Sequence, residues 1–86
     1  MKLNREKVYE LIDGEREYQK TQTIKNNWNE PKRVGEYLSV LRILLSKAEN
    51  EWYSESDLDP KNTLSFIRKI SAIGVACMEE HGAPKR

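Results

Sequence analysis

The sequence predicts an all-α fold, a single domain of three helices over residues 1–86. Two long stretches, residues 32–53 and 59–82, repeat apolar residues at the spacing of about 3.6 that is typical of an amphipathic helix, and residues 4–20 do so more weakly. A short acidic connection joins the two long stretches, which favours an antiparallel helical hairpin with the first helix packed across it. Eighty-six residues are enough for one hydrophobic core but too few for two.

The first helix is expected to run from Asn4, a good helix cap, to about Lys20. Glu15 interrupts its apolar side, because it follows Leu11 by four residues and Val8 by seven. A carboxylate among apolar side chains has to be paired, hydrogen-bonded or bound to a metal ion. Glu15 is therefore the most informative residue of this helix. The other acidic residues are expected on its solvated side, namely Glu10, Asp13 and Glu17.

Residues 21–33 lose the helical pattern and are expected to form a polar loop held in place by Trp28. The loop and the helix end before it carry basic residues that can meet phosphate groups: Lys20, Lys25, Lys32 and Arg33. The alternative is that these residues are simply solvated, as polar connections usually are. The loop contains no glycine-rich phosphate-binding motif.

The second helix is expected from about Lys32 to Tyr53 and has the longest apolar stripe of the chain. We expect this stripe to be core; it consists of Val34, Tyr37, Leu38, Leu41, Leu44, Leu45, Ala48 and Trp52. Glu49 lies at the edge of the stripe, where it can point between the helices toward Glu15. Ile43 and Val40 lie on the other side of the helix and favour a second contact, for example with another subunit.

The third helix is expected to begin at Asp59 and Pro60, because Asp accepts a hydrogen bond from a free backbone N–H and Pro fits the first helical turn. It is expected to end at Gly82, since glycine readily adopts the positive φ of a helix end. Its apolar side is broad, which favours contacts with more than one helix. Gly74 in its middle needs a packing reason, because glycine costs about 1 kcal/mol relative to alanine in a helix.

The charge of the chain is balanced, with 15 basic and 14 acidic residues and a formal net charge of +1. This balance disfavours binding to nucleic acid and to anionic membranes. The single cysteine, Cys77, excludes a disulfide within the chain and favours a reducing compartment. No apolar run is long enough for a signal peptide or a membrane span, so we expect a soluble cytoplasmic protein.

The residues that carry chemistry favour oxygen ligands over zinc binding or nucleophilic catalysis. One cysteine and one histidine, His81, cannot make a zinc site, and His81 at a helix end is expected to interact with the last carbonyl groups rather than to act as a base. Glu15 and Glu49 are the candidate catalytic residues and ligands of a Mg²⁺ ion shared with the phosphates of a substrate. The alternative is that these carboxylates are closed in ion pairs, with Arg16, Arg42 or Arg68. Further candidate site residues are Arg16, Lys20 and Arg68 for phosphate, together with Trp28 and His81.

Two sets of short segments carry a resemblance to a known family. In the first half they are Glu15-Arg16-Glu17-Tyr18-Gln19, Trp28, Val34-Gly35-Glu36-Tyr37, Lys47-Ala48-Glu49 and Trp52. In the second half they are Ile67-Arg68-Lys69-Ile70, Cys77-Met78-Glu79-Glu80-His81-Gly82-Ala83-Pro84 and Arg86. Together they resemble a group of small phage and prophage proteins, some of which are described as MazG-like. The resemblance covers nearly the whole chain.

MazG-like proteins are all-α nucleoside triphosphate pyrophosphohydrolases that usually assemble into dimers or tetramers. They hold Mg²⁺ with a Glu-x-x-Glu pair on one helix and a Glu-x-x-Asp pair on the next. The resemblance implies a nucleoside triphosphate substrate, cleaved to the monophosphate and pyrophosphate by a metal-activated water. The chain departs from this pattern, because Glu49 and Glu51 lack the spacing of the first pair and basic residues stand where the second is expected. The acidic motif is therefore incomplete.

Two hypotheses follow for the function. The first is a MazG-like, Mg²⁺-dependent nucleoside triphosphate pyrophosphohydrolase or a nucleotide-binding relative, whose metal site is either rebuilt with Glu15 and carboxylates of a second subunit or lost. The second is a non-enzymatic phage accessory protein that binds a host protein through its helical surface, in the host cytoplasm. For both we expect a homodimer, because pairing would bury the apolar residues on two sides of the second helix and on the broad side of the third.

Overall fold

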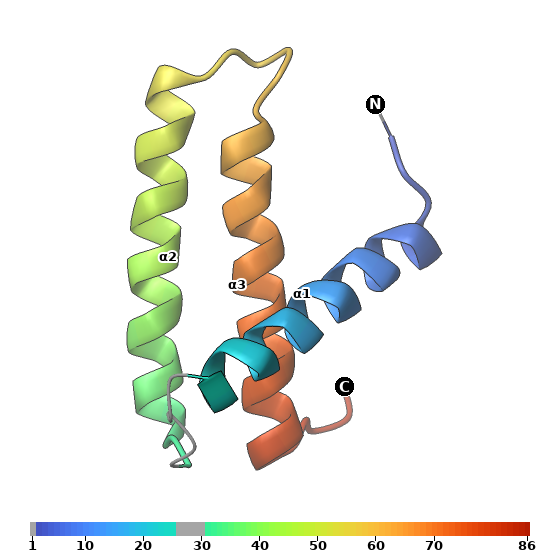
Figure 1. Ribbon diagram of the computed structural model, residues 1–86, viewed down its shortest axis with the longest axis vertical. Helices are drawn as coiled ribbons and strands as arrows, with labels where there is room; N and C mark the ends of the chain where they lie inside the picture. Colours follow the sequence, from blue (N-terminus) through green and yellow to red (C-terminus); the bar gives the residue numbers. More distant parts are fainter. Residues whose placement is uncertain (1, 26–30) are drawn as a thin grey trace.

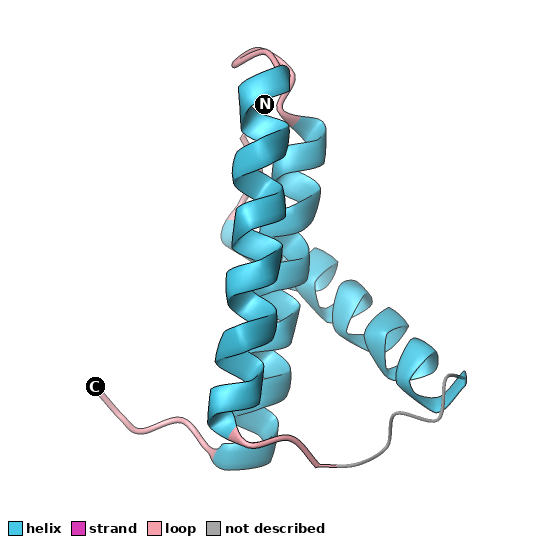
Figure 2. Cartoon of the chain, turned by 90° about the vertical axis from the view of Figure 1, so that its left-hand side faces the viewer, coloured by secondary structure: helices cyan, strands magenta, loops and turns pink. Residues whose placement is uncertain are grey.

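The structure, a computed structural model, describes residues 2–25 and 31–86 and confirms the all-α prediction. Within these residues it contains three helices: α1 (Arg5–Lys25), α2 (Val34–Ser54) and α3 (Lys61–His81). Helices α2 and α3 lie side by side and run in opposite directions, so they form the predicted antiparallel hairpin (Figure 1). Helix α1 crosses α3 on one side of this hairpin (Figure 2). Within the described residues, the backbones of α1 and α2 do not approach each other.

Helix α1 begins at the predicted cap, since the side-chain carbonyl of Asn4 accepts a hydrogen bond from the Lys7 N–H at 2.8 Å. It continues to Lys25, beyond the predicted end. The hydroxyls of Thr21 and Thr23 donate to the backbone carbonyls four residues earlier, at 3.2 and 3.0 Å. These bonds satisfy the hydroxyls inside the helix, so the polar composition of this stretch does not end it.

The start of α3 is capped by Glu55 and not by Asp59, which corrects the prediction. The Glu55 carboxylate accepts hydrogen bonds from the backbone N–H groups of Asn62 and Thr63, at 2.7 and 2.9 Å, and from the Thr63 hydroxyl at 2.6 Å. Asp59 lies in the turn before the helix, where its own N–H donates to a carbonyl of that turn. Because Glu55 directly follows α2, one side chain joins the end of that helix to the start of α3.

The end of α3 follows the prediction at Gly82. The Gly82 N–H donates to the Met78 carbonyl at 2.8 Å, and its φ is +94°. A side chain is strained at this φ, so glycine is the residue that closes the helix with least cost.

The buried core of a single chain is small. Among the described residues, the only buried apolar side chains are those of Ala48, Ala72 and Ala76, and no large side chain is fully buried. Four apolar residues of α2 that were expected in the core are between 46% and 60% exposed: Val34, Leu38, Leu45 and Trp52. The prediction that the whole stripe is core is wrong for the single chain, because α1 packs on only one side of the hairpin.

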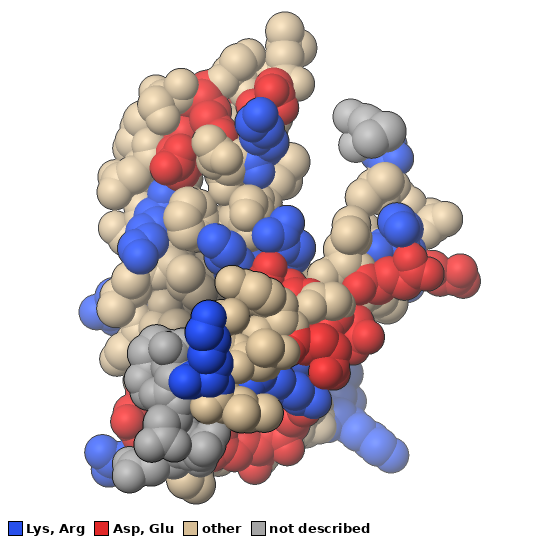
Figure 3. Space-filling view, in the orientation of Figure 1, with Lys and Arg blue, Asp and Glu red and all other residues tan. Residues whose placement is uncertain are grey.

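The surface carries charges of both signs. Basic and acidic side chains are interspersed on the face that includes α1 (Figure 3), as the formal net charge of +1 leads one to expect. None of the helices in the described ranges combines the length and the apolar character that crossing a bilayer requires.

Glu55→Ala is expected to loosen the start of α3 and to lower the midpoint of thermal unfolding by a few degrees. Burial alone would raise the pKa of Glu55, but the bonds from the Thr63 hydroxyl and from the Thr63 and Asn62 N–H groups hold it below the ordinary value of 4.5. A lowered carboxyl pKa stabilises the fold above the ordinary value, and this stability is lost as the pH falls through the lowered pKa. Melts followed by circular dichroism at neutral and acidic pH should show that the variant loses less stability on acidification than the wild type.

Asp59→Ala is the matched control for the cap of α3. It removes the carboxylate that the sequence assigned to this role, and its melting midpoint should stay at the wild-type value. Equal destabilisation by the two substitutions would contradict the assignment to Glu55.

Candidate functional site

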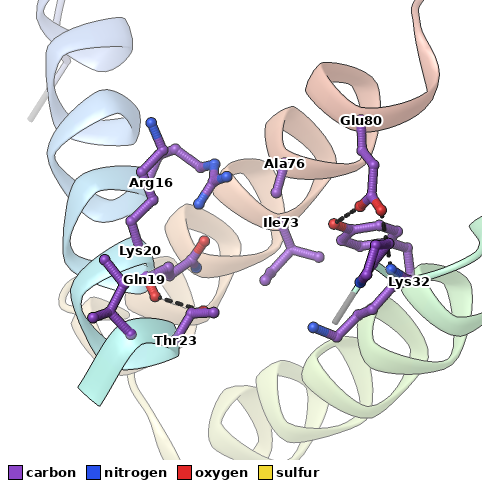
Figure 4. Close-up of a pocket in the computed structure, with 11 residues that line it drawn as sticks. Arg16, Gln19, Lys20, Thr23, Lys32, Ile73, Ala76 and Glu80 are labelled. Atoms are coloured by element: carbon purple, nitrogen blue, oxygen red, sulfur yellow. Dashed lines mark hydrogen bonds between the residues drawn. The ribbon is translucent and has the colours of Figure 1, made fainter. Parts of the chain in front are cut away.

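A pocket of about 390 Å³ lies between the C-terminal half of α1 and the end of the hairpin at which α2 begins and α3 ends (Figure 4). Its volume is within the range of about 300–1,000 Å³ that is usual for small-molecule sites. Ile73 and Ala76 of α3 lie in the middle, with α1 residues on one side and Lys32 and Glu80 on the other. The complete lining is Arg16, Gln19, Lys20, Thr23, Ile24, Pro31, Lys32, Tyr37, Ile73, Ala76 and Glu80.

Three cationic side chains and one carboxylate line this pocket, so its charge is positive. Arg16 is the most firmly held, because its Nε donates to Glu79 Oε1 of α3 at 2.8 Å and only 17% of its side chain is exposed. Lys20 makes a weaker, exposed contact with Glu17, at 3.4 Å. The Nζ of Lys32 lies 6.0 Å from the centre of the Tyr37 ring and forms no ion pair with another described residue. Lys20 and Lys32 can therefore turn toward an anion at little cost.

A hydrogen-bonded cluster fixes the side of the pocket formed by the hairpin. Glu80 accepts a hydrogen bond from the Tyr37 hydroxyl at 2.5 Å and another from the backbone N–H of Lys32 at 3.0 Å. The Nε2 of His81 is bonded to the Lys32 carbonyl at 2.7 Å, and the His81 ring meets the Tyr37 ring edge to face at 6.1 Å. Burial, and then the bond to Glu80, raises the pKa of Tyr37 to about 12. Tyr37 therefore stays protonated over the physiological range and keeps donating to Glu80.

Gln19 lines the pocket and carries an unsatisfied acceptor. Its Nε2 donates to the Lys69 carbonyl of α3 at 3.4 Å, while its Oε1 is buried and receives no hydrogen bond from the described residues. A buried carbonyl without a donor costs about 1–3 kcal/mol, so this atom favours an N–H or O–H donor. A smaller hollow of about 240 Å³ shares Gln19 and Tyr37 and extends toward Val40 of α2.

The two predicted metal ligands lie in different surroundings. Glu15 is buried and accepts a hydrogen bond from Arg68 Nε at 2.8 Å, which is the ion-pair alternative raised by the sequence. Arg68 also donates from a second nitrogen to the Ser65 hydroxyl at 3.2 Å. Glu49 is exposed on α2, and no contact in the described residues joins it to Glu15. In the described ranges, no group of three or more His, Cys, Asp or Glu side chains is placed to hold a metal ion.

The structure brings some of the other predicted site residues together. Arg16 and Lys20 line the pocket, whereas Arg68 lies with Glu15 and does not. His81 acts on the pocket indirectly, through the Lys32 carbonyl. Trp28 lies outside the described residues.

Sequence reasoning missed Gln19, Tyr37 and Glu80 as site residues. Tyr37 was counted in an apolar stripe, and Glu80 was placed on the polar side of the third helix. The available signal was the hydroxyl of Tyr37, because a tyrosine at a core position needs a polar partner.

A comparison of the chain with protein-family models, with curated proteins and with solved structures finds no match. Any function assigned to this chain therefore rests on its own residues and their geometry. The resemblance to small phage proteins stays a prediction.

Arg68→Ala is expected to lower the free energy of unfolding by about 1–3 kcal/mol, because it leaves the buried Glu15 carboxylate without its charged partner. The lower part of this range is expected, since 41% of the Arg68 side chain is exposed and water screens the pair. Urea unfolding followed by circular dichroism measures the change.

A double-mutant cycle supplies the control for this ion pair. In a Glu15→Gln background, Arg68→Ala should cost much less, because the neutral amide no longer needs a cation. Equal costs in the two backgrounds would show that Arg68 acts through packing of its stem and not through its charge.

Proposed function

We propose that this protein binds a phosphorylated small molecule of the nucleotide class in the pocket between α1 and the hairpin. The observation that carries the proposal is the combination, in one pocket, of cationic side chains on both sides and a buried acceptor at Gln19 Oε1. The cations suit phosphate groups, and the acceptor suits an N–H group of the same ligand.

The phosphates fit the open rim of the pocket. Lys20 on α1 and Lys32 before α2 approach it from opposite sides, so both can contact one phosphate chain. Arg16 is already bonded to Glu79, which holds its guanidinium in position with donors left over for a phosphate. A cation that is fixed before binding loses less entropy than a mobile one, so Arg16 is the expected anchor.

The interior of the pocket fits a nucleobase. Ile24, Ile73 and Ala76 supply apolar contacts for the faces of a ring, and Gln19 Oε1 can accept from its edge. Every standard nucleobase carries at least one N–H donor, so this contact favours nucleotides over inorganic phosphates without selecting one base.

The proposal is one of binding, and we assign no hydrolytic step. A Mg²⁺ ion at Glu15 would have to displace Arg68, whose guanidinium already occupies the carboxylate at 2.8 Å, and Glu49 is not placed to help it. The surroundings of Glu15 in this structure therefore do not fit a Mg²⁺ ion. Mg²⁺ usually keeps several waters and binds with the phosphates of a substrate, so it can enter the pocket as a complex with the nucleotide. The MazG-like pyrophosphohydrolase activity remains a separate prediction.

A second candidate is the phage accessory protein that binds a host protein, and the exposed apolar side chains of α2 favour it. We retain the homodimer in both proposals, because so few side chains are buried in one chain. Both proposals place the protein in the cytoplasm, where nucleotides and host proteins are present together.

Calorimetric titration with a panel of nucleoside triphosphates, with and without Mg²⁺, is the test of the binding proposal. Lys20→Glu and Lys32→Glu are each expected to weaken binding about tenfold, because each places a negative charge beside the phosphates. Gln19→Leu should weaken binding while leaving the affinity for pyrophosphate unchanged, since it removes only the acceptor for the base.

Lys7→Glu is the matched control for Lys20→Glu. Both lysines lie on α1 and pair with a glutamate three residues away, but Lys7 lies far from the pocket. Binding unaffected by Lys20→Glu, or weakened equally by Lys7→Glu, would contradict the assigned site. Binding with release of pyrophosphate would add the predicted enzyme activity, and no binding to any nucleotide would favour the host-protein candidate.

A further inference from the structure

A single chain exposes more surface than a compact protein of its size. Its accessible surface is 7299 Å², whereas a folded monomer of 10.1 kDa is expected to expose about 5,300 Å². Its radius of gyration is 14.0 Å, compared with about 12 Å expected for 86 residues. The excess of about 2,000 Å² per chain is within the range that one subunit buries in an obligate homodimer.

Part of the exposed surface lies on the side of the hairpin that α1 leaves open (Figure 2). Helix α3 uses one side for α1, through Arg68 and Glu79. It uses another side for Tyr37 of α2, through Glu80, and for Glu55 just after α2, through Thr63. At about 100° per residue, its remaining side points away from α1. We call this side of the hairpin the free face; its exposed apolar residues are Val34, Leu38, Leu45 and Trp52 of α2 and Leu64, Ile67 and Met78 of α3.

Five of the seven free-face residues are evenly spaced along the two helices. On α2, Leu38 and Trp52 each lie seven residues from Leu45, and on α3, Leu64 and Met78 each lie seven residues from Ser71. A spacing of seven keeps residues on one side of a helix, as in packed helix pairs.

The centres of these two spacings lie at about the same level of the hairpin. The contact of Glu55 with Thr63 and the contact of Tyr37 with Glu80 join the two helices near their ends. Leu45 of α2 and Ser71 of α3 lie about midway between these contacts. A single axis that crosses both helices can therefore pass through both centres.

We propose that the free face binds a second copy of this chain about a two-fold axis that crosses the hairpin at Leu45 and Ser71. In this arrangement α2 packs antiparallel against α2 of the second copy, and α3 against α3, which gives a four-helix bundle with an α1 on each outer side. Leu45 meets its own copy at the axis, and Leu38 of one chain meets Trp52 of the other. The proposal is independent of nucleotide binding, because the pocket lies on the α1 side.

Charge complementarity selects this arrangement. Arg42 and Glu49 flank Leu45 on the outer edge of the free face, three residues before it and four after it. The two-fold axis therefore brings Arg42 of each chain beside Glu49 of the other, twice in the dimer. Neither side chain has an ion-pair partner within the described residues of its own chain. By contrast, Arg68 and Glu79 on α3 are already paired with α1.

The middle of α3, on the free face, suits close packing with another helix. The Ser71 hydroxyl donates to the Ile67 carbonyl at 2.9 Å, so it needs no partner from outside the helix. A Cβ added at Gly74 would meet nothing within 4 Å in the single chain, so packing inside the chain does not explain this glycine. The approach of a second helix does explain it.

The test is sedimentation equilibrium of the full chain over a range of concentrations. The wild type is expected to be dimeric, and Leu45→Glu is expected to be monomeric because it places two carboxylates at the axis. Ile43→Glu is the matched control: Ile43 has a similar exposure, 57% against 54%, but lies on the opposite side of α2. It should leave the dimer intact.

Charge reversal tests the arrangement without relying on a core substitution. Arg42→Glu and Glu49→Arg are each expected to weaken the dimer about tenfold or more, and the double variant is expected to restore it. A wild type that stays monomeric at high concentration overturns the proposal. A dimer that resists Leu45→Glu, or one in which the double reversal fails to restore association, overturns it as well.

Discussion

The attachment of α1 to α3 is the contact on which the rest of this structure depends. It includes three polar contacts: Arg16 with Glu79, Gln19 with the Lys69 carbonyl, and the buried Glu15 with Arg68 of α3. Hydrogen bonds are directional, so these contacts help to fix the angle at which α1 crosses α3. Helix α1 therefore diverges from α2, which leaves the pocket between them and leaves the other side of the hairpin uncovered.

The pocket and the free face are thus two consequences of one arrangement, and they have different chemistry. The pocket is positively charged and holds a buried amide oxygen, which suits a small polar anion. The free face carries exposed apolar residues that are evenly spaced along α2, with one positive and one negative residue at its edge, which suits a copy of itself. A ligand and a second subunit can therefore bind at the same time without competing for the same residues.

The helices could be predicted from the sequence because each depends on local signals, such as the Asn4 cap and the positive φ of Gly82. The cap of α3 could not, because Glu55 reaches it across a turn that no local pattern describes. Glu15 was identified as a misfit on one helix, but its partner lies 53 residues away. Helical spacing shows which side of a helix a residue occupies, not which helix covers that side. For the same reason the α2 stripe was assigned to the core.

The separation of contacts along the chain also sets the order of folding. The Glu55 carboxylate meets Thr63 only eight residues away, whereas the contacts of α1 span 50 residues or more, up to 63 for Arg16 and Glu79. Closing a longer loop costs more chain entropy, so we expect the hairpin to form first and α1 to dock on it afterwards. The pocket, which needs α1, is then the last part of the chain to be assembled. We therefore expect α1 to detach first when the fold opens locally, and a ligand held in the pocket to oppose this opening.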